Sequence, residues 1–208
     1  MSHRALDERV QHEYAHLAPL YDRRWRVYLD RSLEATLARL PADGGESILD
    51  VGCGSGELLR RLHARYPDAR LTGIDASAAM LATARAKLGT EAQLACAHAA
   101  MQPFPGATFD LVVSTSVLHH LPKPEAALAE IRRVLKPGGW LVLTDWCGDF
   151  LSCRLMKLWL SMRRRPIVRV YRGAECQRML ERAGFRTQRL DRYRINWPWG
   201  LMTLTAAR

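Results

Sequence analysis

A predicted strand that runs into three closely spaced glycines and then into a helix restricts the fold of this chain more than any other feature. Residues 49–58 read Leu-Asp-Val-Gly-Cys-Gly-Ser-Gly-Glu-Leu. A side chain at Gly52, Gly54 or Gly56 would occupy the space through which a ligand approaches the backbone, whereas glycine leaves that space open. The segment therefore predicts a nucleotide-like ligand held between the first strand and the first helix of an α/β sheet.

Short apolar runs alternate with helical patterns from Ser47 to Thr144, which is typical of strand-helix-strand units around a parallel sheet. Two further strands, at about 185–195 and 201–207, follow a helix at 174–183. We expect an α/β, Rossmann-like, doubly wound sheet of seven mostly parallel strands, with a C-terminal antiparallel hairpin and an N-terminal helical cap. In the central part, strands are predicted at 48–51, 70–75, 93–97, 109–115 and 140–145, helices at 57–66, between Ser77 and Gly89, and at 124–135, and a turn at 136–139.

The chain length predicts one domain with three parts, because chains of roughly 100–200 residues usually fold around a single core. Residues 1–44 form the N-terminal helical cap, in which two helices are expected, the second from about Trp25 to Leu40. Residues 45–146 form the ligand-binding core. Residues 147–208 carry the remaining elements, including an apolar helix at 150–162, and are expected to face the second substrate.

The formal net charge of +10 is concentrated at the C-terminal end of the chain. Residues 1–150 contain 17 basic and 18 acidic residues, whereas residues 151–208 contain 14 basic and 3 acidic residues. Such a basic segment favours contact with nucleic acid or with an anionic membrane. The apolar helix at 150–162, which is followed by Arg163-Arg164-Arg165, fits peripheral contact with an anionic membrane surface or a lid over the site.

The composition excludes several classes of protein. A hydrophobic content of 48% with 25% charged residues is typical of a globular chain and not of a disordered or multi-pass membrane protein. No apolar run approaches the ~18 residues of a membrane span, and the chain does not begin with a secretory signal. We therefore expect a cytoplasmic protein. The five cysteines are scattered without a Cys-x-x-Cys pair, so neither a disulfide framework nor a metal site is expected.

Acidic residues near the glycines distinguish between nucleotide ligands. Glu57 stands where a dinucleotide-binding loop requires glycine, and its carboxylate would repel a pyrophosphate, so NAD is disfavoured. Asp75 ends the second predicted strand, where it is placed to accept hydrogen bonds from two ribose hydroxyls. Asp50 lies within a buried strand and requires a partner, either the amides of the loop or a ligand ammonium. A cationic nucleoside without phosphate is compatible with this pattern.

Five blocks of the sequence occur in the order found in class I S-adenosylmethionine-dependent methyltransferases. They are Asp-x-Gly-x-Gly-x-Gly at 50–56, Gly73-Ile74-Asp75, the segment from Pro103 to Val113, Leu118-His119-His120-Leu121, and Leu135-Lys136-Pro137-Gly138-Gly139. Over residues 45–146 the chain most resembles the small-molecule subgroup that includes the ubiquinone and menaquinone biosynthesis C-methyltransferases. The resemblance implies S-adenosyl-L-methionine as the cofactor and a single methyltransferase domain over residues 1–208.

The resemblance also assigns residues to parts of the cofactor. The loop from Gly52 to Gly56 would hold the methionine part, with Ser55 near its carboxylate, and Asp75 would bind the ribose. His98 and Ala99 stand where the family usually has an acid and a small residue. A histidine replaces that acid as a hydrogen-bond acceptor only as a neutral ring with the right tautomer. Further cofactor contacts are expected at Ala76 and Met80, beside the adenine, and at Ser114 and Thr115, beside the cofactor's amino group.

Methyl transfer from a sulfonium is an in-line displacement, which a site promotes mainly by holding the acceptor and the methyl group in line. A general base is needed only when the acceptor is a poor nucleophile. His119, after the fourth strand, is the candidate for an acid/base or acceptor-binding role, and His120 for a structural one. Tyr21, on a helix that closes the site in the resembling family, and Trp146 are further candidates for contact with the acceptor.

Three functions are open at this point. The first is methyl transfer to a small-molecule acceptor of lipophilic or aromatic character. The second is methylation of RNA or another nucleic acid through the basic C-terminal region, and the third is S-adenosylmethionine binding without catalysis. Ser114-Thr115-Ser116-Val117 stands where base-flipping enzymes carry an Asn/Asp-Pro-Pro-Tyr motif, which disfavours the second. The acceptor, the methylated atom and the oligomeric state are left open by the sequence.

Overall fold

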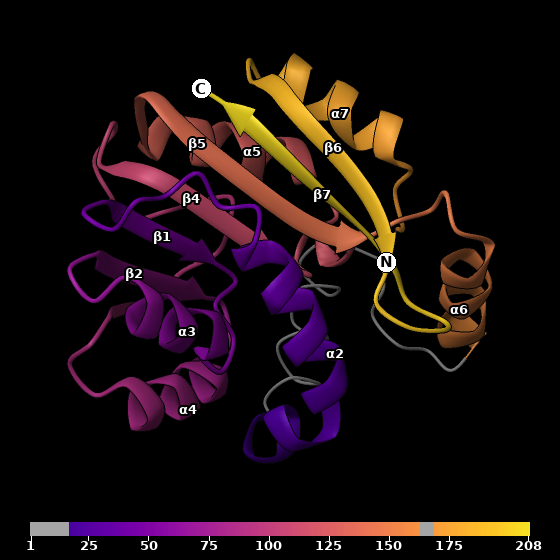
Figure 1. Cartoon of the computed structure of the whole chain (residues 1–208), viewed down its shortest axis with the longest axis horizontal. Helices are drawn as coiled ribbons and strands as arrows, with labels where there is room; N and C mark the ends of the chain where they lie inside the picture. Colours follow the sequence, from indigo (N-terminus) through magenta and orange to yellow (C-terminus); the bar gives the residue numbers. More distant parts are fainter. Residues whose placement is uncertain (1–16, 163–168) are drawn as a thin grey trace.

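Seven strands form one sheet at the centre of the molecule (Figure 1). The computed structural model describes residues 17–162 and 169–208. The strand order is β3-β2-β1-β4-β5-β7-β6, in which β1 to β5 are parallel and β7 is antiparallel to both of its neighbours. The expected fold class is therefore confirmed. The strands are β1 (Ser47–Val51), β2 (Arg70–Asp75), β3 (Gln93–Cys96), β4 (Phe109–Thr115), β5 (Leu135–Trp146), β6 (Arg186–Arg194) and β7 (Gly200–Ala207).

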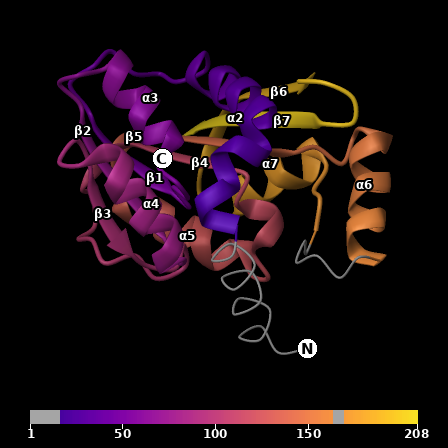
Figure 2. The same cartoon turned by 90° about the horizontal axis from the view of Figure 1, so that it is seen from below.

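Helices cover both faces of the sheet (Figure 2). Successive side chains of a strand point to opposite faces. Ile48 of β1 accordingly packs in the cluster that includes α2, α3 and α4, whereas Leu49 packs in the cluster that includes α5 and α7. The helices are α2 (Tyr21–Leu37), α3 (Glu57–Arg65), α4 (Ala78–Leu88), α5 (Pro124–Val134), α6 (Leu151–Met162) and α7 (Gly173–Arg182), with short 3-10 helices η1 (Ala18–Leu20) and η2 (Leu118–His120).

The strand order reverses between β1 and β4. The chain proceeds from β1 to β2 and β3 on one side, and then returns to β4 and β5 on the other side of β1. In doubly wound sheets the carboxyl ends of the strands leave a crevice at such a point, and ligands bind there. α2 lies across this end of the sheet in both views (Figures 1 and 2).

Two local expectations differ from the structure, and a third lies outside the described residues. The segment 136–139 was expected as a turn before a strand, but β5 already begins at Leu135, and its pairing with β4 shifts register between Phe109 and Leu111. The extra residues are therefore accommodated as an irregularity inside a paired strand. α2 runs from Tyr21 to Leu37 and not from about Trp25 to Leu40. The first helix expected near the N-terminus falls mainly on residues 1–16, outside the described residues.

Candidate functional site

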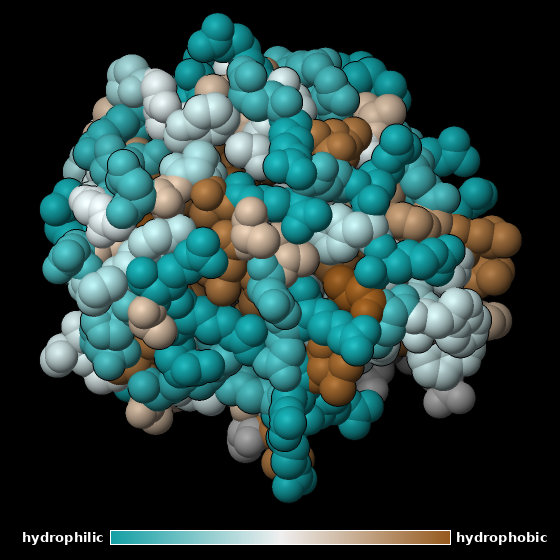
Figure 3. Space-filling model, viewed as in Figure 1, coloured by the Kyte–Doolittle hydropathy of each residue, from teal (hydrophilic) through white to brown (hydrophobic). Residues whose placement is uncertain are grey.

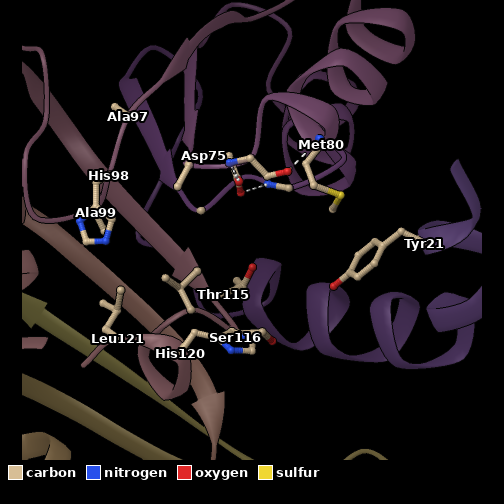
Figure 4. A pocket seen from close by; sticks show the side chains of 15 residues that line it. Tyr21, Asp75, Met80, Ala97, His98, Ala99, Thr115, Ser116, His120 and Leu121 are labelled. Carbon is tan, nitrogen blue, oxygen red and sulfur yellow. Dashed lines mark hydrogen bonds between the residues drawn. The ribbon is translucent and has the colours of Figure 1, made fainter. Parts of the chain in front are cut away.

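A pocket opens at the carboxyl ends of β1, β2 and β4, next to the first turn of α2 (Figure 4). We call it the wide pocket, and its walls include Tyr21, Asp75, Met80, His98, Ser116 and His120. A second pocket, the loop pocket, lies beneath the glycine-containing loop, and its walls include Asp50, Cys53, Ser55 and Glu57. Tyr21, Gly52, Gly54, Thr115 and Ser116 line both pockets. A ligand with two chemically different halves therefore fits across them.

The Asp75 carboxylate is held in place by the backbone. Its Oδ2 accepts a hydrogen bond from the Gly54 N–H at 2.9 Å, and its Oδ1 accepts one from the Ser77 N–H at 2.8 Å. Burial raises the pKa of Asp75, and these two N–H groups oppose that shift. Each carboxylate oxygen has a further lone pair, and Asp75 lines the wide pocket (Figure 4). Asp75 is thus an oriented acceptor for a pair of hydroxyl groups.

Gly52 and Gly56 have different structural roles. Gly52 has a φ of +77°, and a Cβ there would lie 2.3 Å from Cγ2 of Val117. A Cβ on Gly56 would instead meet Leu88 Cδ1 at 2.8 Å and Ala84 Cβ at 3.0 Å, on the neighbouring helix α4. Gly52 therefore allows Val117 to pack directly against the backbone of the loop, whereas Gly56 allows α3 and α4 to pack closely.

Asp50 is a buried carboxyl group with an unsatisfied oxygen. Its side chain is 1% exposed, and Oδ1 has no hydrogen-bond partner. Burial, together with the negative charge of Asp75, raises the pKa of Asp50 to about 8. A buried, unpaired acceptor is costly unless a ligand supplies the missing donor. Because Asp50 lines the loop pocket, a cationic group bound there would satisfy it.

Hydrogen bonds of Asp22 hold the first turn of α2 against the loop pocket. The Asp22 carboxylate accepts a hydrogen bond from the Ser55 hydroxyl and one from Lys87 Nζ at 2.6 Å. Lys87 also lies 3.2 Å from Glu57. Burial acts to raise the pKa of Glu57, but hydrogen bonds from three basic side chains outweigh it and lower that pKa to about 2. Tyr21 beside Asp22 has a pKa raised to about 12, by burial and by nearby carboxylates, so it stays protonated as a donor.

Comparison with known proteins places this geometry in a family. The family model described as a methyltransferase domain matches residues 49–143. The O-methyltransferase resE of Aspergillus sclerotiorum is 30% identical over 183 residues, which cover 86% of this chain and 69% of that protein. The chain belongs to the S-adenosylmethionine-dependent methyltransferase family.

Other methyltransferases match parts of the chain or its fold. The trans-aconitate 2-methyltransferase of Paracidovorax citrulli is 35% identical over 125 residues, covering 60% of this chain and 48% of that protein. This chain thus spans about half the length of that relative. An S-adenosylmethionine-dependent methyltransferase from Mesorhizobium loti superposes with a TM-score of 0.72 at 22% identity, over 86% of this chain and 98% of that one. This last likeness shows a shared fold.

The two pockets fit the family's cofactor, S-adenosylmethionine. The unsatisfied Oδ1 of Asp50 matches the cofactor's ammonium group, and the backbone-held carboxylate of Asp75 matches its ribose hydroxyls. Gly52 lines both pockets, and a side chain there would collide with Val117, another residue of the wide pocket. The loop pocket would therefore hold the methionine part of the cofactor and the wide pocket its adenosine part.

Most residues predicted for the methyltransferase site come together at these pockets. Ser114 does not line either one, because its side chain is buried and donates to the Val51 carbonyl at 3.1 Å. Gly56 serves helix packing, as described above. The predicted residues that line the wide pocket are Tyr21, Gly52, Gly54, Asp75, Ala76, Met80, His98, Ala99 and Thr115, and those that line only the loop pocket are Asp50 and Ser55.

His98 presents a different group from the acceptor expected there. Its Nδ1 accepts a hydrogen bond from the Ala100 N–H at 3.2 Å. In the neutral ring the proton is then on Nε2, which becomes a donor. A donor beside the adenine suits a ring nitrogen of the base and does not suit its amino group. The acid that the family usually carries is thus replaced by a group of the opposite hydrogen-bonding character.

The structure separates the two neighbouring histidines. His120 lines the wide pocket, whereas His119 is buried behind it, with Nδ1 2.5 Å from Asp145 Oδ1 and its ring stacked on Trp146 at a centroid distance of 5.0 Å. His119 and Trp146 were both expected to contact the acceptor, but neither lines the pocket. The pairing with Asp145 turns the His119 ring inward and leaves the pocket wall to His120, which was expected to be structural.

Ser116, which the sequence interpretation did not single out, lies where the two pockets meet. Its backbone adopts a φ of +59°, an unusual conformation for a residue with a side chain. Trp146 Nε1 donates to the Tyr28 hydroxyl oxygen at 3.0 Å, and that hydroxyl lies 2.7 Å from Ser116 Oγ. Trp146 can only donate, so the Tyr28 oxygen accepts from it, whereas either hydroxyl can donate in the hydrogen bond between Tyr28 and Ser116. The chain of hydrogen bonds links the Ser116 side chain, where the two pockets meet, to the buried Trp146 indole.

Tyr28→Phe is expected to lower the free energy of unfolding by about 1–3 kcal/mol, because the buried Trp146 N–H loses its acceptor. Affinity for S-adenosylmethionine should stay within about twofold, since Tyr28 does not line either pocket. Urea unfolding and calorimetric titration measure the two quantities. Tyr66→Phe is the matched control, at a ring that is 9% exposed compared with 8% for Tyr28. Equal destabilisation of both variants would contradict the hydrogen-bond chain.

Proposed function

We propose that this protein transfers the methyl group of S-adenosylmethionine to a small, uncharged, lipophilic or aromatic acceptor. The unsatisfied Asp50 oxygen in the loop pocket carries the cofactor part of the proposal. The acceptor part rests on the walls of the wide pocket that follow β4, beside the part of the pocket that would hold the adenosine. Val117, His120 and Leu121 follow β4 there, and no lysine or arginine is among its described lining residues. An anionic acceptor would lack a cationic partner in these walls.

The residues of the chain act mainly by holding the reactants. When bound, S-adenosylmethionine supplies an electrophilic methyl group on its sulfonium. Asp50 binds the ammonium end of the cofactor, and Asp75 binds the ribose. Tyr21 and the first turn of α2 exclude water from the two pockets. Alignment of the acceptor with the methyl group then lowers the barrier without further chemistry from the protein.

We infer that His120 lies nearest to the acceptor among the ionisable groups that follow β4. It lines the wide pocket, and its ring centroid lies 4.1 Å from that of His119. His119, fixed by Asp145, supports His120 from behind. If the acceptor loses a proton during transfer, His120 is placed to receive it. If the acceptor is a carbon or an amine that needs no base, His120 serves as a wall.

The choice of acceptor is supported by the sequence resemblance more than by the relatives. The names of the relatives describe methylation of trans-aconitate and O-methylation. The resemblance to the ubiquinone and menaquinone biosynthesis C-methyltransferases supports a lipophilic ring, in agreement with the absence of lysine and arginine among the described lining residues of the wide pocket. Peripheral contact with an anionic membrane belongs to the same proposal, because lipophilic acceptors collect in membranes.

Incubation with methyl-labelled S-adenosylmethionine and a cell lysate, followed by separation into lipid, water-soluble and nucleic-acid fractions, tests this function. Label is expected in the organic-solvent extract. Asp75→Ala, which removes the ribose acceptor, should leave every fraction unlabelled. Label in the nucleic-acid fraction would favour the basic C-terminal region as an RNA or DNA surface and would overturn the proposal. S-adenosylmethionine binding with no labelled fraction would indicate a non-catalytic binding protein.

A further inference from the structure

α6 is apolar on two opposite sides, and only one of them is covered. Cys153 is buried, and Met156 and Leu160 pack against the cluster that contains Tyr28 and Trp146. The other side carries Leu151, Leu155, Leu158 and Met162, at the spacing of one helical stripe, and each of these is more than half exposed. A soluble helix normally places polar residues on such a face.

Two exposed tryptophans lie on α6 and on the segment next to it. Trp159 is 45% exposed on α6, and Trp197 is 83% exposed on the connection between β6 and β7. That connection contacts α6, because Cys153 Sγ lies 3.8 Å from the Pro198 carbonyl oxygen. Both views place α6 at one end of the molecule beside this connection, and hydrophobic residues lie at the surface there (Figures 1, 2 and 3). We call Leu151, Leu155, Leu158, Trp159, Met162 and Trp197 the α6 surface.

The exposed apolar residues are concentrated on this surface and not scattered. Of the nine large hydrophobic side chains exposed within residues 17–162 and 169–208, six belong to the α6 surface. Contiguous apolar patches of this kind mark sites of interaction. α6 has 12 residues, and no helix of the described part of the chain is long and apolar enough to cross a membrane. The helix is therefore suited to lie along an interface and not to cross a membrane.

The charged residues of α6 are basic, and a further arginine lies beside it. Arg154 and Lys157 belong to α6, which contains no acidic residue. Arg194 approaches from β6, where it donates to Ser152 at 3.3 Å and lies over the Phe150 ring at 4.8 Å. Each Lys or Arg near an anionic bilayer contributes about 1 kcal/mol of attraction, and tryptophan prefers the bilayer interface. Two copies of this chain would bring like charges together on this face.

We propose that the α6 surface docks the protein on a membrane that carries anionic lipid, with the leucines and tryptophans in the interface and the basic side chains at the headgroups. A nucleic acid would use the charges but leave six apolar side chains in water, so a bilayer fits both observations. The inner side of α6 packs against the cluster that contains Tyr28, whose hydroxyl contacts Ser116 at the pocket. Docking therefore brings the acceptor side of the pocket close to the membrane.

Co-sedimentation with vesicles tests this proposal independently of the methyl transfer. The protein is expected to bind phosphatidylcholine vesicles that contain phosphatidylglycerol, and to bind pure phosphatidylcholine vesicles weakly. Leu155→Glu/Leu158→Glu should lower binding about tenfold or more, because two apolar anchors are lost and two charges are repelled. Arg154→Gln/Lys157→Gln should lower binding to the anionic vesicles alone, by several-fold.

The matched control is Leu20→Glu/Val27→Glu, which makes the same charge change at residues that are 52% and 58% exposed on η1 and α2, compared with 58% and 56% for Leu155 and Leu158. It should retain vesicle binding to within about twofold. Equal loss in both double variants would overturn the proposal. A dimer in light scattering that the Leu155→Glu/Leu158→Glu variant separates, without vesicle binding by the unaltered chain, would overturn it in favour of contact between copies. Unchanged S-adenosylmethionine affinity of that variant shows that the fold is intact.

Discussion

Asp75→Ala is expected to weaken S-adenosylmethionine binding by at least about 100-fold, because two charge-assisted hydrogen bonds to the ribose are lost together. The substitution also removes the acceptor of the Gly54 and Ser77 N–H groups, which loosens the loop that the cofactor needs. Calorimetric titration of the purified protein measures the change. Thermal unfolding is followed in parallel, so that loss of binding can be distinguished from loss of the fold.

Asp110→Ala is the matched control for this prediction. Asp110 also accepts a hydrogen bond from a backbone N–H, that of Ser47 at 3.0 Å, and it pairs with Lys136 at 2.8 Å. Asp110 is the second residue of β4 and lines neither pocket. Its removal should therefore leave S-adenosylmethionine affinity within about twofold. An Asp75→Ala protein that folds and binds the cofactor as tightly as the Asp110→Ala protein would refute the ribose assignment.

Asp50→Asn is expected to make the free protein more stable while weakening S-adenosylmethionine binding about 10- to 100-fold. The folded chain raises the pKa of Asp50 from 3.8 to about 8, so the folded state holds a proton that the unfolded state releases above about pH 4. The contribution of this group to stability is thus fully present below pH 4 and is lost as pH rises toward 8. Asparagine has no charge to bury and escapes this loss.

The stability difference between Asp50→Asn and the unaltered protein should therefore grow from about pH 4 to about pH 8, where it reaches about 5 kcal/mol. Urea unfolding at several pH values measures it. In the unaltered protein, the ammonium group should drive Asp50 to its ionised form, so S-adenosylmethionine binding at pH 7 should release about one proton to the buffer. Calorimetry in buffers of different ionisation enthalpy detects this release. Binding without proton release, or a variant less stable at pH 8, would contradict the role of Asp50.

The sequence predicted the sheet and the cofactor end of the site because both depend on local patterns. β2 and β4 were predicted with the observed bounds, since each is a short apolar run between turn residues. Gly52 and Asp75 follow directly from a strand end, and parallel strands bring their carboxyl ends together. For these residues, the position in the sequence relative to a strand is sufficient to predict the position in the folded sheet.

The acceptor end depends on contacts that the sequence pattern does not contain. His119 and His120 are neighbours in the sequence, and nothing in the sequence pattern distinguishes their roles. In the structure, His120 lines the wide pocket, whereas His119 is bound by Asp145, 26 residues later. The choice between Ser114 and Ser116 depends on a single backbone dihedral angle, the φ of +59° at Ser116. The contact between Lys87 and Asp22 joins residues 65 positions apart. Such pairings follow only from the packing of α2 on the finished sheet.

The fastening of α2 by Asp22, Ser55 and Lys87 has a consequence for the timing of the reaction. If the cofactor binds in the loop pocket as proposed, the helix held there by these contacts would also cover it, and each catalytic cycle would require the contacts to open and form again. We expect the spent cofactor to leave slowly and the escape step to limit the turnover rate.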